Sequence, residues 1–120
     1  MTGHHILLVE DDAAISEMFA LAFTEGGYLI DVAATVAEAQ AALDRSRYAL
    51  VIVDWRLPDG NGRHIADRAA NEGAETILLT GYVHVMPFGQ MDRHQIVPKP
   101  VRPSELLAIV ERRLARTPAD

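Results

Sequence analysis

Two apolar runs that each end on carboxylates constrain this chain more than any other feature. Residues 49–53 read Ala-Leu-Val-Ile-Val and stop at Asp54, and residues 6–9 read Ile-Leu-Leu-Val and stop at the acidic residues 10–12. Aliphatic runs without polar alternation are typical of strands buried on both faces, as in a parallel sheet covered by helices. The carboxyl ends of such strands share one edge, where ligands bind in open α/β sheets. Because four carboxylates at one edge repel one another, we expect a cation there.

The rest of the chain alternates helical and strand patterns, which predicts an α/β fold with a doubly wound parallel sheet. Thr35 and Glu38 form a capping box for a helix expected to end near Arg45, and Pro103 opens the last helix. A third helix is expected over about 63–72. Strands are expected at about 5–10, 28–34, 49–54, 75–80 and 95–97. Buried helical faces are expected from Ile15, Met18, Phe19, Ala22 and Phe23, and from Leu106, Leu107, Val110 and Leu114.

Size and composition fit one soluble globular domain. The chain has 120 residues, 49% hydrophobic and 23% charged, and no apolar run approaches the roughly 20 residues that span a bilayer. Its start lacks a secretion signal, and the lack of cysteine fits the cytoplasm. The net charge of −6 argues against nucleic acid as a partner, because duplex binding depends on Lys and Arg contacts to phosphates. We therefore expect a cytoplasmic protein without nucleic-acid or membrane contacts.

Asp54 beside the acidic residues 10–12 favours a phosphoryl acceptor assisted by Mg²⁺. This ion prefers hard oxygen ligands and usually takes one or two carboxylates together with phosphate oxygens, and carboxylates are known nucleophiles toward phosphoryl groups. Thr80 ends the fourth strand and Lys99 follows the fifth, so a hydroxyl and an ammonium can bind phosphoryl oxygens at the same edge. The alternatives are a helix cap for Asp12, a turn residue for Asp54, a strand-capping Thr80 and a surface Lys99.

These residues occur in the order and spacing of the receiver domains of two-component response regulators, and the resemblance covers essentially the whole chain. It implies a flavodoxin-like (βα)5 fold with a five-stranded parallel sheet in the order 2-1-3-4-5. It also implies a single receiver domain over 1–120, with 1–4 and 117–120 frayed. The residues that carry the resemblance are Glu10, Asp11, Asp54, Pro58, Gly62, Thr80, Lys99 and Pro100.

The resemblance implies roles for the residues at the sheet edge. Asp54 would accept a phosphoryl group from a sensor histidine kinase or a phosphotransfer protein, and Lys99 would contact the phosphate. The Mg²⁺ cofactor would be bound directly by Asp11 and Asp54 and through water by Glu10. The backbone carbonyl of Arg56 would supply a further protein ligand.

The switch region departs from the family pattern. Thr80 would be the switch hydroxyl, but Ile96 stands where receivers usually carry the Tyr or Phe that swings inward on activation. Residues 80–82, Thr-Gly-Tyr, approximate the receiver branch called FATGUY. Arg56 and Tyr82 occupy positions that flank the approach of water in receivers, so we predict that together they slow the loss of phosphate.

Residues 82–94 cover the place of the fourth helix of receivers. Pro87 would cost a helix interior roughly 3 kcal/mol and Gly89 about 1 kcal/mol more. We therefore predict a short or irregular fourth helix that becomes ordered on phosphorylation. The histidines receive no functional role: His4 and His5 are expected in a disordered start, and His64, His84 and His94 are expected to face solvent.

The expected function is that of a stand-alone response regulator receiver, a signalling phosphoacceptor rather than an enzyme. It would take part in its own phosphoryl transfer and slow autodephosphorylation, and would signal to an unknown protein target by contacts that depend on phosphorylation. A pseudo-receiver that binds without phosphate is disfavoured because every phosphorylation residue is present. An Asp-nucleophile phosphatase uses Asp-x-Asp after its first strand, whereas here Arg56 follows the third-strand Asp54.

Overall fold

The parallel sheet predicted from the apolar runs is present in the computed structural model, which describes residues 3–81 and 93–115. Five parallel strands lie in the order β2-β1-β3-β6-β7. Because β4 and β5 form a separate hairpin, β6 and β7 are the fourth and fifth strands of the sheet, and the expected order is confirmed. The strands are β1 (His5–Val9), β2 (Leu29–Ala33), β3 (Leu50–Asp54), β4 (Arg56–Leu57), β5 (Gly60–Asn61), β6 (Glu75–Thr80) and β7 (Gln95–Pro98).

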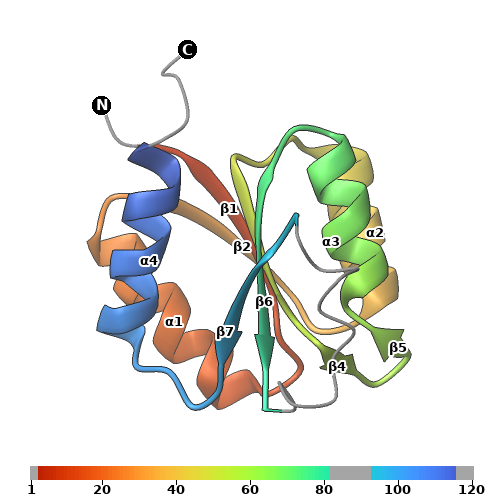
Figure 1. Ribbon diagram of the computed structural model, residues 1–120, viewed down its shortest axis with the longest axis horizontal. Helices are drawn as coiled ribbons and strands as arrows, with labels where there is room; N and C mark the ends of the chain where they lie inside the picture. The colour runs from red at the N-terminus through yellow and green to blue at the C-terminus, as the bar shows by residue number, and fades with distance from the viewer. Residues whose placement is uncertain (1–2, 82–92, 116–120) are drawn as a thin grey trace.

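The described helices cover both faces of the sheet, with α1 and α4 on one face and α2 and α3 on the other (Figure 1). Each face buries its own apolar cluster, because successive strand residues point to opposite sides. Leu7 and Val53 pack on the side of α2 and α3, whereas Leu8 and Ile52 pack on the side of α1 and α4. The helices are α1 (Ala13–Glu25), α2 (Val36–Arg45), α3 (Arg63–Asn71) and α4 (Pro103–Ala115).

Side-chain caps start α1 and α2, and the capping box predicted for α2 is present. The Glu38 amide donates to the Thr35 hydroxyl oxygen at 3.0 Å, and the Glu38 carboxylate accepts from the Ala34 amide at 2.9 Å. In α1 the Ile15 amide donates to Oδ1 of Asp12 at 3.0 Å. Asp12 is therefore the N-cap of α1, the alternative that the sequence left open for it.

The buried face of α1 differs from the predicted one, because it includes a polar residue. Met18, expected in the core, is 48% exposed, and Ser16 is buried instead, in line with Phe19 and Phe23. The Ser16 hydroxyl donates to the carbonyl of Ala13 at 3.1 Å, so its polar group is satisfied within its own helix. Apolar periodicity alone cannot identify such a buried serine. In α4 the expected Leu106, Val110 and Leu114 are buried and Leu107 is half-buried.

The ends of the chain fall only partly within the described residues. The Gly3 amide donates to the carbonyl of Gly27, and the His4 carbonyl accepts from the amide of Leu29, each at 3.1 Å. Residues 3 and 4 thus bond to the backbone at and just before the start of β2. Residues 1–2, 82–92 and 116–120 lie outside the description, and with them lie Tyr82 and most of the expected fourth helix. Those expectations stay predictions.

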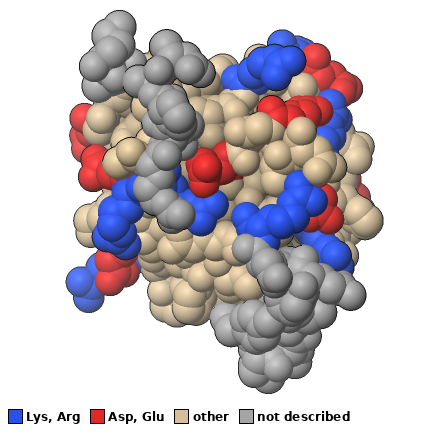
Figure 2. All heavy atoms as spheres, turned by 45° about the horizontal axis from the view of Figure 1, so that its top comes forward, with Lys and Arg blue, Asp and Glu red and all other residues tan. Residues whose placement is uncertain are grey.

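Charged side chains of both signs are interspersed on the face shown in Figure 2. The ion pairs between described residues include Arg68 with Asp44 at 2.6 Å and with Glu72 at 3.0 Å, and Arg113 with Glu75 at 2.6 Å. Within 3–81 and 93–115, no helix combines the length and apolar character that crossing a bilayer requires.

Candidate functional site

The strand register places the predicted acidic residues side by side. Val9 pairs with Val53 across β1 and β3, so the residues that follow them, Glu10 and Asp54, are neighbours at the carboxyl edge of the sheet. Asp11 lies in the connection to α1, and carboxylate oxygens of these three acidic residues all lie within 4.8 Å of one another. The cluster expected from the two apolar runs is therefore formed.

Lys99 reaches this cluster from the end of the edge strand β7. Thr80 pairs with Pro98 across β6 and β7, and Lys99 follows, its amide donating to the Thr80 carbonyl at 2.9 Å. Its Nζ lies 3.0 Å from Oδ2 of Asp54 and 3.7 Å from Oε1 of Glu10. Partial burial lowers the pKa of the Lys99 ammonium, but the carboxylates around it raise the pKa by more, so it lies above its ordinary value. Lys99 is therefore a site cation and not the surface lysine of the alternative interpretation.

Glu10 is the least solvated carboxylate of the cluster, with 2% of its surface exposed. Burial, together with the negative charge of Asp54, raises the pKa of its carboxyl to about 7, although the hydrogen bond from the Asp12 amide opposes this shift. Among the described residues Oε1 of Glu10 has no hydrogen-bond partner, whereas Oε2 accepts from that amide at 3.1 Å. A buried oxygen left in this state beside a second carboxylate is a suitable position for a cation.

The donor set of the cluster fits a hard divalent cation. All of its ligand atoms are carboxylate oxygens, which Mg²⁺ prefers, and three such residues leave room for waters or phosphate oxygens. Glu10, Asp11 and Asp54 are thus the residues that could hold the expected ion. A pocket of about 400 Å³ opens beside them. It is lined by Asp11, Asp54, Trp55, Arg56, Thr80, Gly81 and Lys99.

The loop after Asp54 is a tight hairpin rather than a plain turn. β4 and β5 pair antiparallel, and the Gly62 amide donates to the carbonyl of Trp55 at 2.8 Å. A Cβ at Gly62 would stand 2.3 Å from the carbonyl oxygen of Asp54 and 2.6 Å from Cγ2 of Val53. Only glycine allows this approach. The hairpin therefore folds back onto the end of β3 and places Arg56 on the pocket wall.

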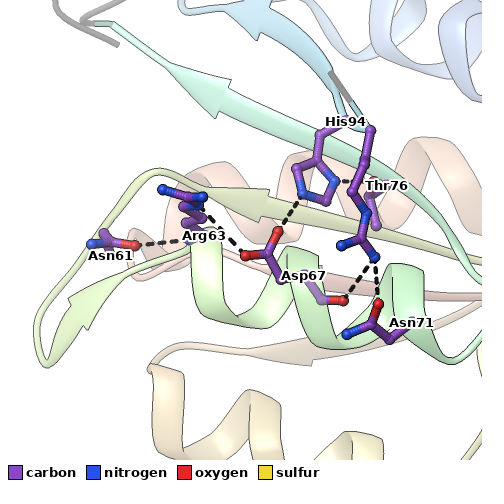
Figure 3. A network of polar contacts seen from close by, with 7 residues as sticks. Asn61, Arg63, Asp67, Asn71, Thr76 and His94 are labelled. Carbon is purple, nitrogen blue, oxygen red and sulfur yellow. Dashed lines mark hydrogen bonds and ion pairs between the residues drawn. The ribbon is translucent and has the colours of Figure 1, made fainter. Parts of the chain in front are cut away.

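His94, expected to face solvent, is buried in a polar network between β6 and α3 (Figure 3). Its Nε2 lies 2.8 Å from Oδ1 of Asp67, and its Nδ1 bonds to the hydroxyl of Thr76. Because both ring nitrogens have partners, the imidazole can be buried without an orphaned polar atom. The expectation failed because spacing along the chain does not reveal these partners. The one sequence sign is Thr76, a polar residue inside an apolar strand.

The same three side chains have the order of a hydrolase triad, hydroxyl to imidazole to carboxylate. Thr76 is 1% exposed, however, so a substrate cannot reach its hydroxyl. Arg93 donates to Oδ1 of Asn71 at 2.7 Å. Arg63 pairs with Asp67 at 3.5 Å (Figure 3). The network therefore fastens the start of β7 to α3 and is not a catalytic site.

Comparison with known families settles what kind of domain carries this acidic site. The sequence model of the response regulator receiver domain matches residues 6–111, which is most of the chain. The chain belongs to the response regulator receiver domain family. Receiver domains are signalling phosphoacceptors that are generally not classed as enzymes, and phosphorylation and Mg²⁺ binding are typical of them.

Individual relatives of the receiver domain agree with this assignment. The phosphate regulon transcriptional regulatory protein PhoB of Pseudomonas aeruginosa is 31% identical over 127 residues, covering 98% of this chain and 54% of that protein. A CheY-like receiver domain protein from Methanospirillum hungatei has a TM-score of 0.87 at 28% identity, with 95% of both chains covered. The non-phosphorylated HemR receiver domain from Leptospira biflexa has a TM-score of 0.83 at 28% identity, with 98% of both covered. This receiver domain spans about half or less of the length of the curated relatives it matches.

Proposed function

We propose that this receiver domain accepts a phosphoryl group on Asp54 from a histidine kinase or a phosphotransfer protein, in a reaction that depends on Mg²⁺. The observation that carries the proposal is the Lys99 ammonium 3.0 Å from the Asp54 carboxylate, beside the buried Glu10 oxygen that lacks a hydrogen-bond partner among the described residues. When bound, Mg²⁺ would supply positive charge that offsets the repulsion between the carboxylates and the incoming phosphoryl oxygens. Asp11, Asp54 and the Arg56 carbonyl would hold it directly, and Glu10 through water.

In this proposal Asp54 is the nucleophile. One of its carboxylate oxygens forms a bond to phosphorus while the bond from phosphorus to the donor histidine nitrogen breaks, and the nitrogen keeps the electron pair. Lys99 then shares its positive charge with a phosphoryl oxygen. The Thr80 hydroxyl, at the end of β6 and on the pocket wall, donates to another. Movement of Thr80 toward the phosphoryl group would carry the signal into the segment that follows it.

The proposed output is a change in protein contacts. This chain matches about half or less of each relative that is named a transcriptional regulator, so the proposal does not include the activities of those whole proteins. We propose that the receiver domain itself forms contacts that depend on phosphorylation. That it acts without an output domain, in the cytoplasm and without touching nucleic acid remains a prediction.

The test is incubation with Mg²⁺ and acetyl phosphate, a small acyl-phosphate donor, followed by intact mass measurement. We expect one phosphoryl adduct that requires Mg²⁺ and is absent from Asp54→Asn. Asp44→Asn is the matched control, because Asp44 is an exposed carboxylate at the far end of α2. An adduct that persists in Asp54→Asn would contradict the assignment. No adduct on the wild-type chain would favour the pseudo-receiver instead.

A further inference from the structure

The first turn of α2 is capped by a residue from a distant part of the chain. Oδ1 of Asp59 accepts from the Val36 amide at 2.8 Å, and Oδ2 accepts from the Ala37 amide at 3.1 Å. The next amide, that of Glu38, is bound by the Thr35 hydroxyl. Thr35 caps only one amide of the first turn, so the two bonds from Asp59 satisfy amides that Thr35 does not. They fasten the β4–β5 hairpin to α2.

This hairpin connects the two sides of the acidic site. At one end it is separated from Asp54 by one residue, and it carries Arg56 on the pocket wall. At the other end Asp59 holds the N-terminus of α2. The end of β2, which leads into the loop before α2, is fixed to the opposite side of the site, because the Glu10 amide donates to the carbonyl of Ala33 at 2.9 Å.

Together with the pairing of β1 and β3, the described contacts therefore form a ring that passes through Glu10 and Asp54. The ring runs from the backbone of Glu10 through the β2–α2 loop to α2, through Asp59 into the hairpin, and along Arg56 back to Asp54. If the Asp59 bonds are removed, the tip of the hairpin loses its attachment to α2, while buried Leu57 and the Gly62 contacts still hold its base. The position of the hairpin relative to Glu10 is then less constrained.

We propose that Asp59 is a positioning residue for the metal site, holding the hairpin and the Arg56 carbonyl at a fixed distance from Glu10 and Asp11. The inference rests on the proposed function and adds to it a residue that does not touch the ion. Mg²⁺ demands nearly ideal octahedral geometry, so a ligand on a loose hairpin weakens binding. Groups that orient metal ligands typically change affinity by about 10- to 100-fold when they are removed. Hydrogen bonds from the Val36 and Ala37 amides, the first of them the stronger, lower the pKa of Asp59, so its carboxylate is charged at neutral pH.

The experiment compares two caps of the same helix. Asp59→Ala removes the bonds to Val36 and Ala37, and Thr35→Ala removes the bond to Glu38 but leaves the hairpin attached. Mg²⁺ is titrated against the emission of Trp55, which lines the pocket, and unfolding in urea is measured for each variant. We expect Asp59→Ala to raise the Kd for Mg²⁺ about tenfold. Thr35→Ala should keep the wild-type Kd while losing a similar amount of stability.

A third variant should have an intermediate effect on the Kd for Mg²⁺. Asp59→Asn retains one acceptor oxygen, so its Kd should fall between those of the wild type and Asp59→Ala. The proposal is overturned if Asp59→Ala binds Mg²⁺ as the wild type does. It is also overturned if both caps raise the Kd equally, because the cause is then the stability of α2. Failure of the wild-type chain to bind Mg²⁺ or to form the acetyl phosphate adduct would overturn the proposed function as well, which separates that result from the first two.

Discussion

The Glu10 carboxyl couples the charge state of the site to the stability of the fold. Its pKa rises from an ordinary value of 4.5 to about 7 in the folded chain, chiefly by burial and next through the charge of Asp54. Between these two values the folded chain holds a proton that the unfolded chain has lost. Folding therefore takes up protons in this window, and the contribution of Glu10 to stability falls as the pH rises through it.

We predict that the difference in stability between Glu10→Gln and the wild type depends on pH. In buffer with EDTA we expect Glu10→Gln to gain stability relative to the wild type as the pH rises from about 5 to about 8. The glutamine amide stays uncharged over this range, whereas Glu10 ionises beside Asp54. Urea unfolding at several pH values measures the difference. A difference that is constant across the range would show that Glu10 does not ionise in the folded chain as described.

Single residues also show how far the sequence could predict the site. Asp54, Thr80 and Lys99 could be found because each marks the carboxyl end of an apolar strand, and parallel strands share that edge. Asp59 and His94 could not. Asp59 bonds to amides 22 and 23 positions away in the sequence, and His94 bonds to a carboxylate 27 positions away. No local pattern indicates which residues meet across such a separation.

Among the elements, the β4–β5 hairpin depends on one glycine. Gly62→Ala would place a Cβ 2.3 Å from the Asp54 carbonyl oxygen, so the backbone of the hairpin or of β3 must move. We expect a loss of stability of about 2 kcal/mol, as for other overpacked sites. Gly81→Ala is the control, because a Cβ there meets no atom within 4 Å. Equal urea midpoints for the two variants would rule out the close approach.

The junction of α3 with β6 and β7 depends on a buried histidine. His94→Leu would leave the Thr76 hydroxyl without its imidazole partner and remove one bond to Asp67. We expect a loss of about 2 kcal/mol in the free energy of unfolding, the usual cost of an unsatisfied buried group. Thermal or urea unfolding measures it. His64→Leu, at an exposed position on α3, should change stability little, and a similar loss there would contradict a specific role for His94.

At the scale of the whole molecule, the sequence predicts the layers more directly than the order of the strands. Alternating strand and helix patterns with continuous apolar runs require a sheet covered on both faces, which is what the structure shows. The order 2-1-3-4-5 came from the family resemblance, because apolar patterns do not state which strands become neighbours. That choice depends on the direction in which the chain crosses over after β2.

The position of Lys99 has a consequence for synthesis on the ribosome. It is added 45 positions after Asp54, with which it pairs. At about 5–20 residues per second this addition takes roughly 2 to 9 seconds. During that interval the nascent chain already holds the carboxylates of Glu10, Asp11 and Asp54 but not their ammonium. We expect repulsion between the carboxylates to oppose the joining of β1 to β3 in this interval, and dissolved divalent cations to reduce that repulsion. A side chain near the end of the chain thus neutralises charge that earlier residues have placed.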